Sequence, residues 1–457
     1  MKKFICLVLV FIFAFPLVSC EKTFNAFIND VSIRDYVIVY SDQDADYSLR
    51  AAKYIQSQIK ERTGHQLKLV EDDTAKKNHE IVVGNTNRAI SEKLDAKTTG
   101  LEFAILADEG SIALEGDYFI IAAAAYFFIN TYVPGGDSET TVPSEVSVHK
   151  PIQKEAKNFI LLIGDGMGYY QTKLFEQMQN NLEYSDGEDI FYGHLLPYHG
   201  FSRTNSLSGT TDSAAGGTSL ACGVKTNNRY VGKDKDGNDI KNLTEVAFEL
   251  GKNTAVLSTD KDTGATPSTF SAHVMDRYDD TKEILQDQLF AYQNYGTIIE
   301  CGYDYYNRDI KEIIEVYIED TLEDLSGDEN GFFMMYEEAY IDKHCDDMNI
   351  TGAFKALVRF NQAIGRFMEF AFYNPDTFVL ITADHETGDL KPDENGVLEF
   401  STKEHTSANV PIFAYGVGAE LFDGVEIENI QISHTIAALM GNDNHGDQSV
   451  YKSLTKQ

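Results

Sequence analysis

Hydrophobic residues in the longer, C-terminal part of the chain fall into short runs separated by amphipathic stretches. The runs cover residues 159–163, 254–258, 332–336, 378–382 and 410–415. Runs of this length that alternate with helical periodicity are typical of a parallel sheet covered by helices. The pattern predicts an α/β fold for residues 151–457, a three-layer sandwich with a largely parallel central sheet. Ligands of such sheets bind beyond the carboxyl ends of the strands.

A smaller α/β pattern precedes this part. Strands are predicted over residues 36–40, 67–70 and 80–83, and helices over residues 46–63 and 120–133. The stretch 134–151 is rich in Pro, Gly, Ser and Thr, so we place a domain boundary there and expect an N-terminal accessory domain over residues 20–150.

The accessory domain carries three loosely characteristic strings, at residues 51–55, 62–64 and 81–85. In these it resembles the small α/β domain that precedes catalytic domains in some secreted, carbohydrate-active bacterial proteins. Carbohydrate binding and a purely structural spacer are both open for it.

The N-terminus has the pattern of a targeting signal. Lys2 and Lys3 precede an apolar run over residues 4–18, which is shorter than the ~20 residues of a membrane span. The run ends in Leu-Val-Ser-Cys, which resembles a bacterial lipobox. We therefore expect residues 1–19 to be a lipoprotein signal peptide and Cys20 to carry the lipid that attaches the protein to a membrane outside the cytoplasm. A plain secretory signal is the alternative.

Charge and cysteine content narrow the possible partners. The net charge of −34 argues against a nucleic-acid-binding surface, because phosphate backbones need a basic one. An anionic substrate must then be held by bound metal or by a local arginine. The cysteines beyond Cys20 are Cys222, Cys301 and Cys345, an odd set without short spacing, which does not indicate a disulfide framework.

Two motifs combine a carboxylate or a hydroxyl with small residues. Asp165 follows the run 159–163 and is flanked by glycines that allow close approach of a ligand; it could equally be a helix N-cap. Ser213 begins a helix of small side chains, where the helix dipole favours phosphate. A bound Zn²⁺ would lower the pKa of the serine hydroxyl enough for nucleophilic attack. An N-cap role for Asp212 or Ser213 is the structural alternative.

Other candidate ligands follow later runs. Asp384 and His385 come directly after residues 378–382, and His405 precedes the next run. Glu337 and Asp342 follow the run 332–336 and offer oxygen ligands.

Two further candidates lie between residues 264 and 277. Thr266 offers a hydroxyl before a proline that can start a helix. Arg277, which we expect near the end of that helix, is a candidate clamp for two phosphate oxygens. His273, expected on the same helical face as Arg277, is interpreted as a buried structural residue.

These residues, taken in order, resemble the alkaline phosphatase family from about residue 158 to 415. The matching strings are Asp165-Gly166-Met167-Gly168, Thr211-Asp212-Ser213-Ala214-Ala215, Ala265-Thr266-Pro267 with Arg277, Glu337 with Ile341-Asp342-Lys343, Ala383-Asp384-His385-Glu386 and His405-Thr406. The resemblance implies an alkaline-phosphatase-like sandwich, two Zn²⁺ ions and one Mg²⁺ ion.

The resemblance also implies a role for each residue. Ser213 is expected to be the phosphorylated nucleophile and Arg277 the phosphate clamp. Asp165, Asp384 and His385 would bind the first zinc, Asp342 and His405 the second, and Asp165, Thr266 and Glu337 the magnesium.

Two positions depart from the family pattern. Asp346 stands where a histidine ligand of the second zinc is usual, so the metal at the Asp342/Asp346/His405 site is uncertain; His344 could replace it only if the backbone rearranges. Gly264 stands where an acidic residue or a histidine often supports the magnesium, so we expect looser magnesium binding.

The sequence therefore predicts a metal-dependent phosphate monoester hydrolase that acts through a phosphoserine at Ser213. A phosphodiesterase of the same superfamily is the enzymatic alternative, and a surface lipoprotein with a decayed catalytic site is the binding alternative. A sulfatase is disfavoured because Ser213 lacks the Cys/Ser-x-Pro-x-Arg context. The oligomeric state is left open.

Overall fold

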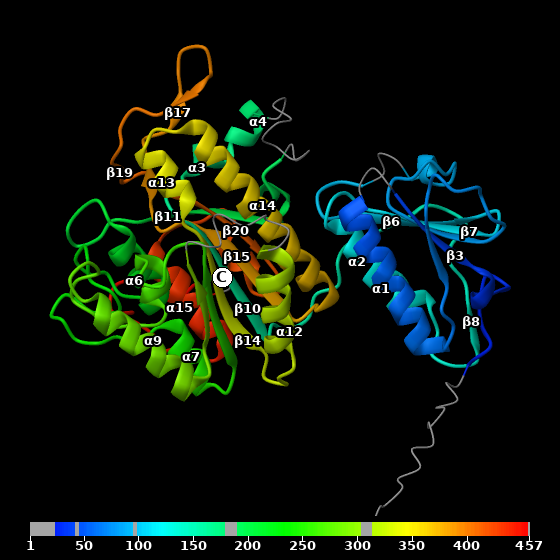
Figure 1. Cartoon of the computed structure of the whole chain (residues 1–457), viewed down its shortest axis with the longest axis horizontal. Coiled ribbons are helices and arrows are strands. Elements are labelled where there is room, and N and C mark those ends of the chain that lie inside the picture. The colour runs from blue at the N-terminus through cyan, green and yellow to red at the C-terminus, as the bar shows by residue number, and fades with distance from the viewer. Residues whose placement is uncertain (1–22, 42–44, 95–97, 179–189, 303–312, 456–457) are drawn as a thin grey trace, which may run out of the picture.

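A computed structural model of the chain describes residues 23–41, 45–94, 98–178, 190–302 and 313–455 (Figure 1). The expected signal peptide and Cys20 lie outside these residues. Within them, no helix is both long enough and apolar enough to cross a membrane.

The larger sheet has the strand order β13-β12-β14-β10-β15-β20-β11-β21. Its strands are β10 (Asn158–Gly164), β11 (Tyr198–Arg203), β12 (Asn253–Ser258), β13 (Ile298–Cys301), β14 (Phe332–Glu338), β15 (Thr377–Thr382), β20 (Val410–Tyr415) and β21 (Glu426–Glu428). The strands from β13 to β15 in this order are mutually parallel, whereas β20 is antiparallel to both of its neighbours. The prediction of an α/β fold with a largely parallel central sheet is confirmed.

Helices cover both faces of this sheet, which explains why its central strands β10, β14, β15 and β20 are largely apolar. Alternate residues of β10 enter different cores: Leu162 packs in the core that contains Leu357 of α14 (Ile350–Tyr373), and Leu161 in the core that contains Leu220 of α6 (Ser213–Cys222) and Ile432 of α15 (Asn429–Met440). The three layers are visible in Figure 1.

The remaining helices and short strands of this part complete the layers and the loops above the sheet. They are α3 (Tyr169–Thr172), α4 (Leu174–Met178), α7 (Leu243–Glu249), α8 (Ala265–Thr269), α9 (Thr281–Tyr295), α12 (Asp320–Ser326), α13 (Tyr340–Asp346), β16 (Glu386–Thr387), β17 (Lys391–Pro392), β18 (Leu398–Glu399) and β19 (His405–Thr406), with 3-10 turns at Tyr192–Leu195 and Ala419–Phe422 and a π-helical turn at Ile314–Glu319.

The N-terminal part forms a second sheet, with strand order β4-β3-β5-β7-β6-β9, and a small one, β2-β1-β8. Their elements are β1 (Ala26–Ile28), β2 (Val31–Ser32), β3 (Val37–Tyr40), α1 (Ala45–Thr63), β4 (Lys68–Glu71), β5 (Glu80–Val83), β6 (Phe103–Asp108), β7 (Ser111–Glu115), α2 (Ile120–Tyr132), β8 (Ser138–Thr140) and β9 (Ser147–His149), with 3-10 turns at Ile33–Asp35 and Ser91–Lys93.

The stretch 134–151 is more structured than a linker. Its strand β8 pairs with β1 and its strand β9 with β6, so the chain leaves the N-terminal sheets only after His149. The expected division at residue 150 falls between strands of different sheets, and the accessory domain as an independent unit stays a prediction.

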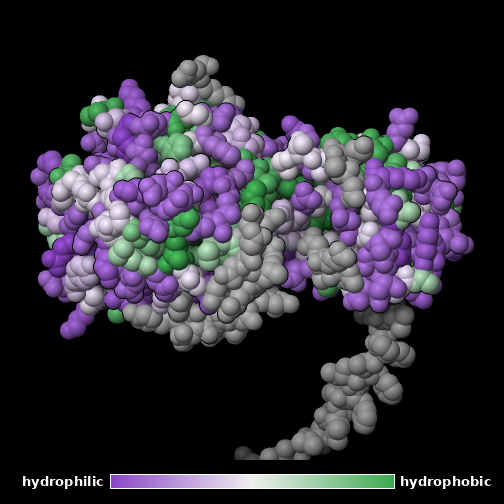
Figure 2. Space-filling model, turned by 90° about the horizontal axis from the view of Figure 1, so that it is seen from above, coloured by the Kyte–Doolittle hydropathy of each residue, from purple (hydrophilic) through white to green (hydrophobic). Residues whose placement is uncertain are grey.

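Helix α14 joins the two parts of the molecule. The ring of Tyr54 on α1 stacks on that of Tyr373, with centroids 4.2 Å apart. Arg50 donates to both carboxylate oxygens of Glu369, at 3.1 and 3.0 Å, and Arg366 pairs with the same carboxylate. Elsewhere the surface seen from above is mostly hydrophilic, as the net charge of −34 requires (Figure 2).

We predict that Arg50→Ala lowers the free energy of unfolding by about 1–2 kcal/mol, because Glu369 is buried and loses a two-pronged partner while keeping Arg366. Urea unfolding measures the change. Arg34→Ala is the matched control, since Arg34 pairs with Asp35 on the open surface, and it should change stability by less than about 0.5 kcal/mol. Equal effects of the two variants would contradict the prediction.

Candidate metal and catalytic centre

The candidate site lies where three neighbouring parallel strands end. In the register of the sheet, Ile163 of β10 stands beside Glu337 of β14 and Thr382 of β15. Asp165, Asp384 and His385 follow within three residues, so all of these polar side chains reach the same edge. The edge is the carboxyl end of the strands, where ligands bind in this type of sheet.

Glycines let the loop after β10 lie against the neighbouring elements. Gly166 has φ of +71°, and a Cβ there would stand 2.8 Å from Asp342 Oδ1. A Cβ on Gly168 would stand 2.3 Å from Cγ of Glu386. Any larger residue at these positions would push the loop, and Asp165 with it, out of place.

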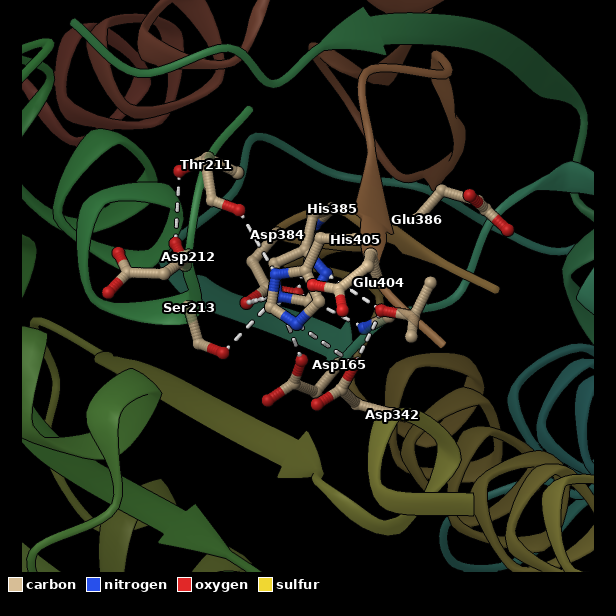
Figure 3. A network of polar contacts seen from close by, with 12 residues as sticks. Asp165, Thr211, Asp212, Ser213, Asp342, Asp384, His385, Glu386, Glu404 and His405 are labelled. Atoms are coloured by element: carbon tan, nitrogen blue, oxygen red, sulfur yellow. Dashed lines mark hydrogen bonds and ion pairs between the residues drawn. The ribbon is translucent and has the colours of Figure 1, made fainter. Parts of the chain in front are cut away.

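Two groups of three side chains bring their ligand atoms within 4.8 Å of one another: Asp165, Asp384 and His385, and Asp342, His385 and His405. His385 Nε2 lies 3.4 Å from Asp165 Oδ1 and 3.3 Å from Asp384 Oδ2, and His405 Nε2 lies 3.5 Å from Asp342 Oδ1. The side chains converge from separate elements around two stacked imidazole rings (Figure 3).

Hydrogen bonds fix which ring nitrogen faces the centre. His405 Nδ1 lies 3.0 Å from the carbonyl oxygen of Thr211, which only accepts, so this nitrogen carries the proton. The Thr387 hydroxyl donates to Asp342 and therefore accepts from His385 Nδ1, 3.2 Å away. Both Nε2 atoms are left with free lone pairs, as metal ligands require.

Burial and mutual repulsion raise the pKa values of the carboxyl groups in this site. Burial, followed by repulsion from Asp342, raises the pKa of Asp384 to about 7. Burial, followed by Asp260, raises the pKa of Glu337 to about 8. The pKa of Asp165 is also raised, by burial and then by Asp384. Buried carboxylates without a compensating cation behave in this way.

Divalent cations fit these residues. Asp165 Oδ1 and Asp384 Oδ2 are buried and have no hydrogen-bond partner among the described residues. Burial and the neighbouring His405 lower the pKa of His385, which keeps its imidazole neutral. Neutral imidazole with carboxylate oxygens is a donor set suited to Zn²⁺.

The magnesium ligands expected from the sequence lie next to this group. Thr266 is the second residue of α8 and is almost fully buried. Glu337 accepts a hydrogen bond from Ser258 and is among the charges that raise the pKa of Asp165. An all-oxygen set of Asp165, Thr266 and Glu337 suits a harder ion such as Mg²⁺.

Ser213 stands at the N-terminus of α6, beside the same centre. Asp212 caps the helix by accepting from the backbone N–H of Ala215 at 2.9 Å. The Ser213 hydroxyl is nearly buried, and its Oγ lies 3.2 Å from His385 Nε2. The serine therefore lies beside both the positive helix end and His385, a candidate metal ligand.

The sequence prediction placed Arg277 and His273 on the helix that begins near Thr266. That prediction is wrong, because neither residue is helical. Helix α8 ends after five residues. The hydroxyls of Ser268 and Ser271 bond to backbone carbonyls one turn back, and such bonds compete with continuation of a helix. Arg277 nevertheless lies close enough to the centre to lower the pKa of Asp165.

The environment of His273 has its own explanation. Its Nε2 lies 3.3 Å from the Glu245 carboxylate and its Nδ1 lies 2.9 Å from the carbonyl oxygen of Gly232. These contacts are those of a structural histidine, which is half-buried rather than fully buried.

The structure distinguishes Asp346 from His344 as the candidate that replaces the usual histidine ligand of the second zinc. Asp346 lies one turn after Asp342, and its pKa is raised to about 6 by burial and by Asp342, while His405 acts to lower it. It lies close enough to act on the pKa of His405, although it is not one of the three clustered ligands. His344 instead packs on α14, where a Cβ on Gly352 would stand 2.5 Å from its Nδ1. Asp346 is therefore the nearer candidate.

Sequence reasoning missed three groups at this site. The Thr387 hydroxyl and the Thr211 carbonyl orient the two histidines. The Asp260 carboxylate raises the pKa of Glu337. The position of Thr387 two residues after His385 is the one signal that the sequence offered.

Comparisons with known proteins agree with this geometry. The family model described as alkaline phosphatase matches residues 156–298 and 306–398, which is more than half of the chain. This chain belongs to the alkaline phosphatase family. The residues before 156, including the N-terminal sheets, lie outside the match.

Individual members of the family are similar at modest identity. Alkaline phosphatase 3 of Bacillus subtilis is 26% identical over 60% of this chain and 70% of its own length. Alkaline phosphatase of Escherichia coli is 24% identical over 67% of this chain and 91% of its own length.

A solved alkaline phosphatase from the Antarctic bacterium TAB5 superposes with a TM-score of 0.54 and 26% identity, covering 63% of this chain and 98% of that one. A variant of that enzyme holds magnesium. The family places this chain among phosphatase-superfamily enzymes, and its neighbours imply metal cofactors.

We predict that the chelator-treated protein loses stability as pH rises from about 4 to about 8, the interval between the ordinary and the folded pKa of these carboxyls. A carboxyl whose pKa is raised in the folded state stabilises the protein fully below the ordinary value of ~4, and this stabilisation is lost as pH rises through the folded pKa. For Glu337 that pKa is about 8. Glu337→Gln should flatten the decline in urea unfolding experiments, and Zn²⁺ with Mg²⁺ should abolish it.

The exposed Glu394→Gln serves as the control for this measurement and should leave the pH dependence unchanged. A Glu337→Gln variant whose stability falls as steeply as that of the wild type would refute the assignment of the decline to this carboxyl.

Proposed function

We propose that this protein hydrolyses phosphate monoesters through a phosphoserine at Ser213, with two Zn²⁺ ions and one Mg²⁺ ion as cofactors. The observation that carries the proposal is the contact of 3.2 Å between Ser213 Oγ and His385 Nε2, within the cluster of buried carboxylates. A hydroxyl so placed has both an anion-favouring helix end and a metal-binding group at hand.

Bound divalent cations would lower the pKa of the serine hydroxyl and neutralise the negative charge of the transferring phosphoryl group. Asp165, Asp384 and His385 would hold one of them beside Ser213. Asp342 and His405, with Asp346 nearby, would hold the second on the side of the leaving group. Thr266 and Glu337 would join Asp165 at the third.

The chain's own groups then perform the binding steps. The Arg277 guanidinium offers two parallel N–H donors to two phosphate oxygens. The N-terminus of α6 adds its partial positive charge behind Ser213. Attack of Ser213 Oγ on phosphorus expels the alcohol, and water then cleaves the phosphoserine to release inorganic phosphate and restore the hydroxyl.

The retained ligand groups argue against a decayed binding lipoprotein. The expected signal peptide of this protein and the lipid expected on Cys20 support an enzyme that acts outside the cytoplasm while attached to a membrane. Asp346 makes the second site more anionic than a histidine would, so binding of a phosphate dianion there depends on the bound cations and on Arg277.

We predict that Ser213→Ala lowers the initial rate on a chromogenic phosphate monoester by about 10³-fold or more, because the covalent step is lost. Protein quenched in acid during turnover should hold covalent phosphate in the wild type and none in the variant. Ser219→Ala is the control from the same helix: its hydroxyl bonds to the Ala215 carbonyl at 2.9 Å, and its activity should persist. A fully active Ser213→Ala protein would rule out the serine mechanism.

Arg277→Ala should lower kcat/KM for the monoester by about 10²-fold, since two charge-assisted hydrogen bonds are lost, and for the matching diester by less. Arg229→Ala is the control, because Arg229 contacts the same Tyr278 ring but pairs with Asp276 at the surface. If the diester is the better substrate of the wild type, the phosphodiesterase hypothesis replaces the monoesterase hypothesis.

A further inference from the structure

The position of Gly264 has a steric explanation. Its φ of −57° is one that any residue adopts, so backbone freedom does not require glycine here. A Cβ at this position would instead stand 2.5 Å from Asp260 Oδ2 and 2.8 Å from its Cγ. The Asp260 carboxylate therefore occupies the space in which a side chain of residue 264 would lie. Residue 264 itself comes two positions before Thr266, a candidate magnesium ligand.

The contacts of Asp260 lead to the candidate magnesium ligands. Its backbone N–H donates to Ser258 Oγ at 2.8 Å, and that hydroxyl in turn donates to Glu337. Its carboxylate accepts from the ammonium group of Lys343, which lies 4.2 Å from the centre of the Tyr340 ring. The Asp260 side chain is largely buried, so these contacts are protected from water.

The charges of the group are interdependent. After burial itself, Asp260 is the largest cause of the raised pKa of Glu337, which places the two carboxylates close together. Glu337 also acts to raise the pKa of Lys343. Without Asp260, Glu337 would remain among the charges that act on the Lys343 ammonium, which would then compete with a cation for it.

We propose that Asp260 is a positioning residue of the third metal site, whose carboxylate fills the side-chain space of Gly264, holds Lys343 off Glu337 and adds negative charge beside the magnesium. The looser magnesium binding expected from Gly264 is then compensated by a carboxylate four residues earlier, in the loop after β12. This inference rests on the proposed function for the presence of the third metal.

The test measures magnesium affinity without using activity. The protein is loaded with two equivalents of Zn²⁺ and dialysed against graded Mg²⁺, and bound magnesium is measured by atomic emission. Asp260→Asn should weaken Mg²⁺ binding about tenfold or more, the usual effect of losing a group that supports a metal ligand. Asp262→Asn removes the same charge from a neighbouring exposed residue and should bind Mg²⁺ like the wild type.

Two further variants separate position from charge. Gly264→Ala removes no charge but places a Cβ where Asp260 Oδ2 lies, so it should also weaken Mg²⁺ binding. It keeps the test valid if Asp260→Asn does not fold. Asp260→Gly combined with Gly264→Asp returns the carboxylate to position 264 and should recover most of the affinity that Asp260→Gly alone loses.

Each outcome decides between the two proposals. If Asp260→Asn or Gly264→Ala binds Mg²⁺ as the wild type does, or if Asp262→Asn is weakened equally, the role of Asp260 is refuted while phosphatase activity stands. If the wild type binds no third ion, the role of Asp260 also fails. A wild type that binds Mg²⁺ in the expected manner but cleaves no monoester would instead overturn the proposed function alone.

Discussion

Mutual repulsion among buried carboxylates is the constraint on which the rest of this site depends. Parallel strands that end at one edge bring Asp165, Glu337 and Asp384 together, and all three side chains are buried. The sheet and its two helical layers hold these charges close, although Asp384 raises the pKa of both Asp165 and Glu337. Either protonation or bound cations would relieve this repulsion, so we expect metal binding, pH and folding to be linked in this protein.

The sequence sufficed for the parts of the fold and the site that depend on local pattern. Strands β10, β12, β14, β15 and β20 of the larger sheet were predicted to within about two residues because they are largely apolar and buried, whereas the more polar strands β11, β13 and β21 were not predicted. The structure brings Asp165, Ser213, Asp384 and His385 together because each lies directly at a strand end or a helix start.

What the sequence could not provide depends on side chains that cross between elements. The helix expected to reach Arg277 stops at Thr269, because serine and threonine hydroxyls bond back to its carbonyls. Asp260 reaches into the space of Gly264 from an earlier loop, and no spacing rule reports that approach. The strands after Pro134 were missed because short edge strands look like loops when their partners lie more than forty residues away.

The contact of α14 with the N-terminal part limits how the molecule can be divided. Phe372 packs against Phe119, Tyr373 against Tyr54, and Glu369 is neutralised by Arg50 as well as Arg366. A truncated chain starting near residue 150 would expose these aromatic rings on the helix that packs against α13, the carrier of Asp342. Excision of the catalytic part by a protease or by cloning would therefore need polar replacements on this face to remain soluble.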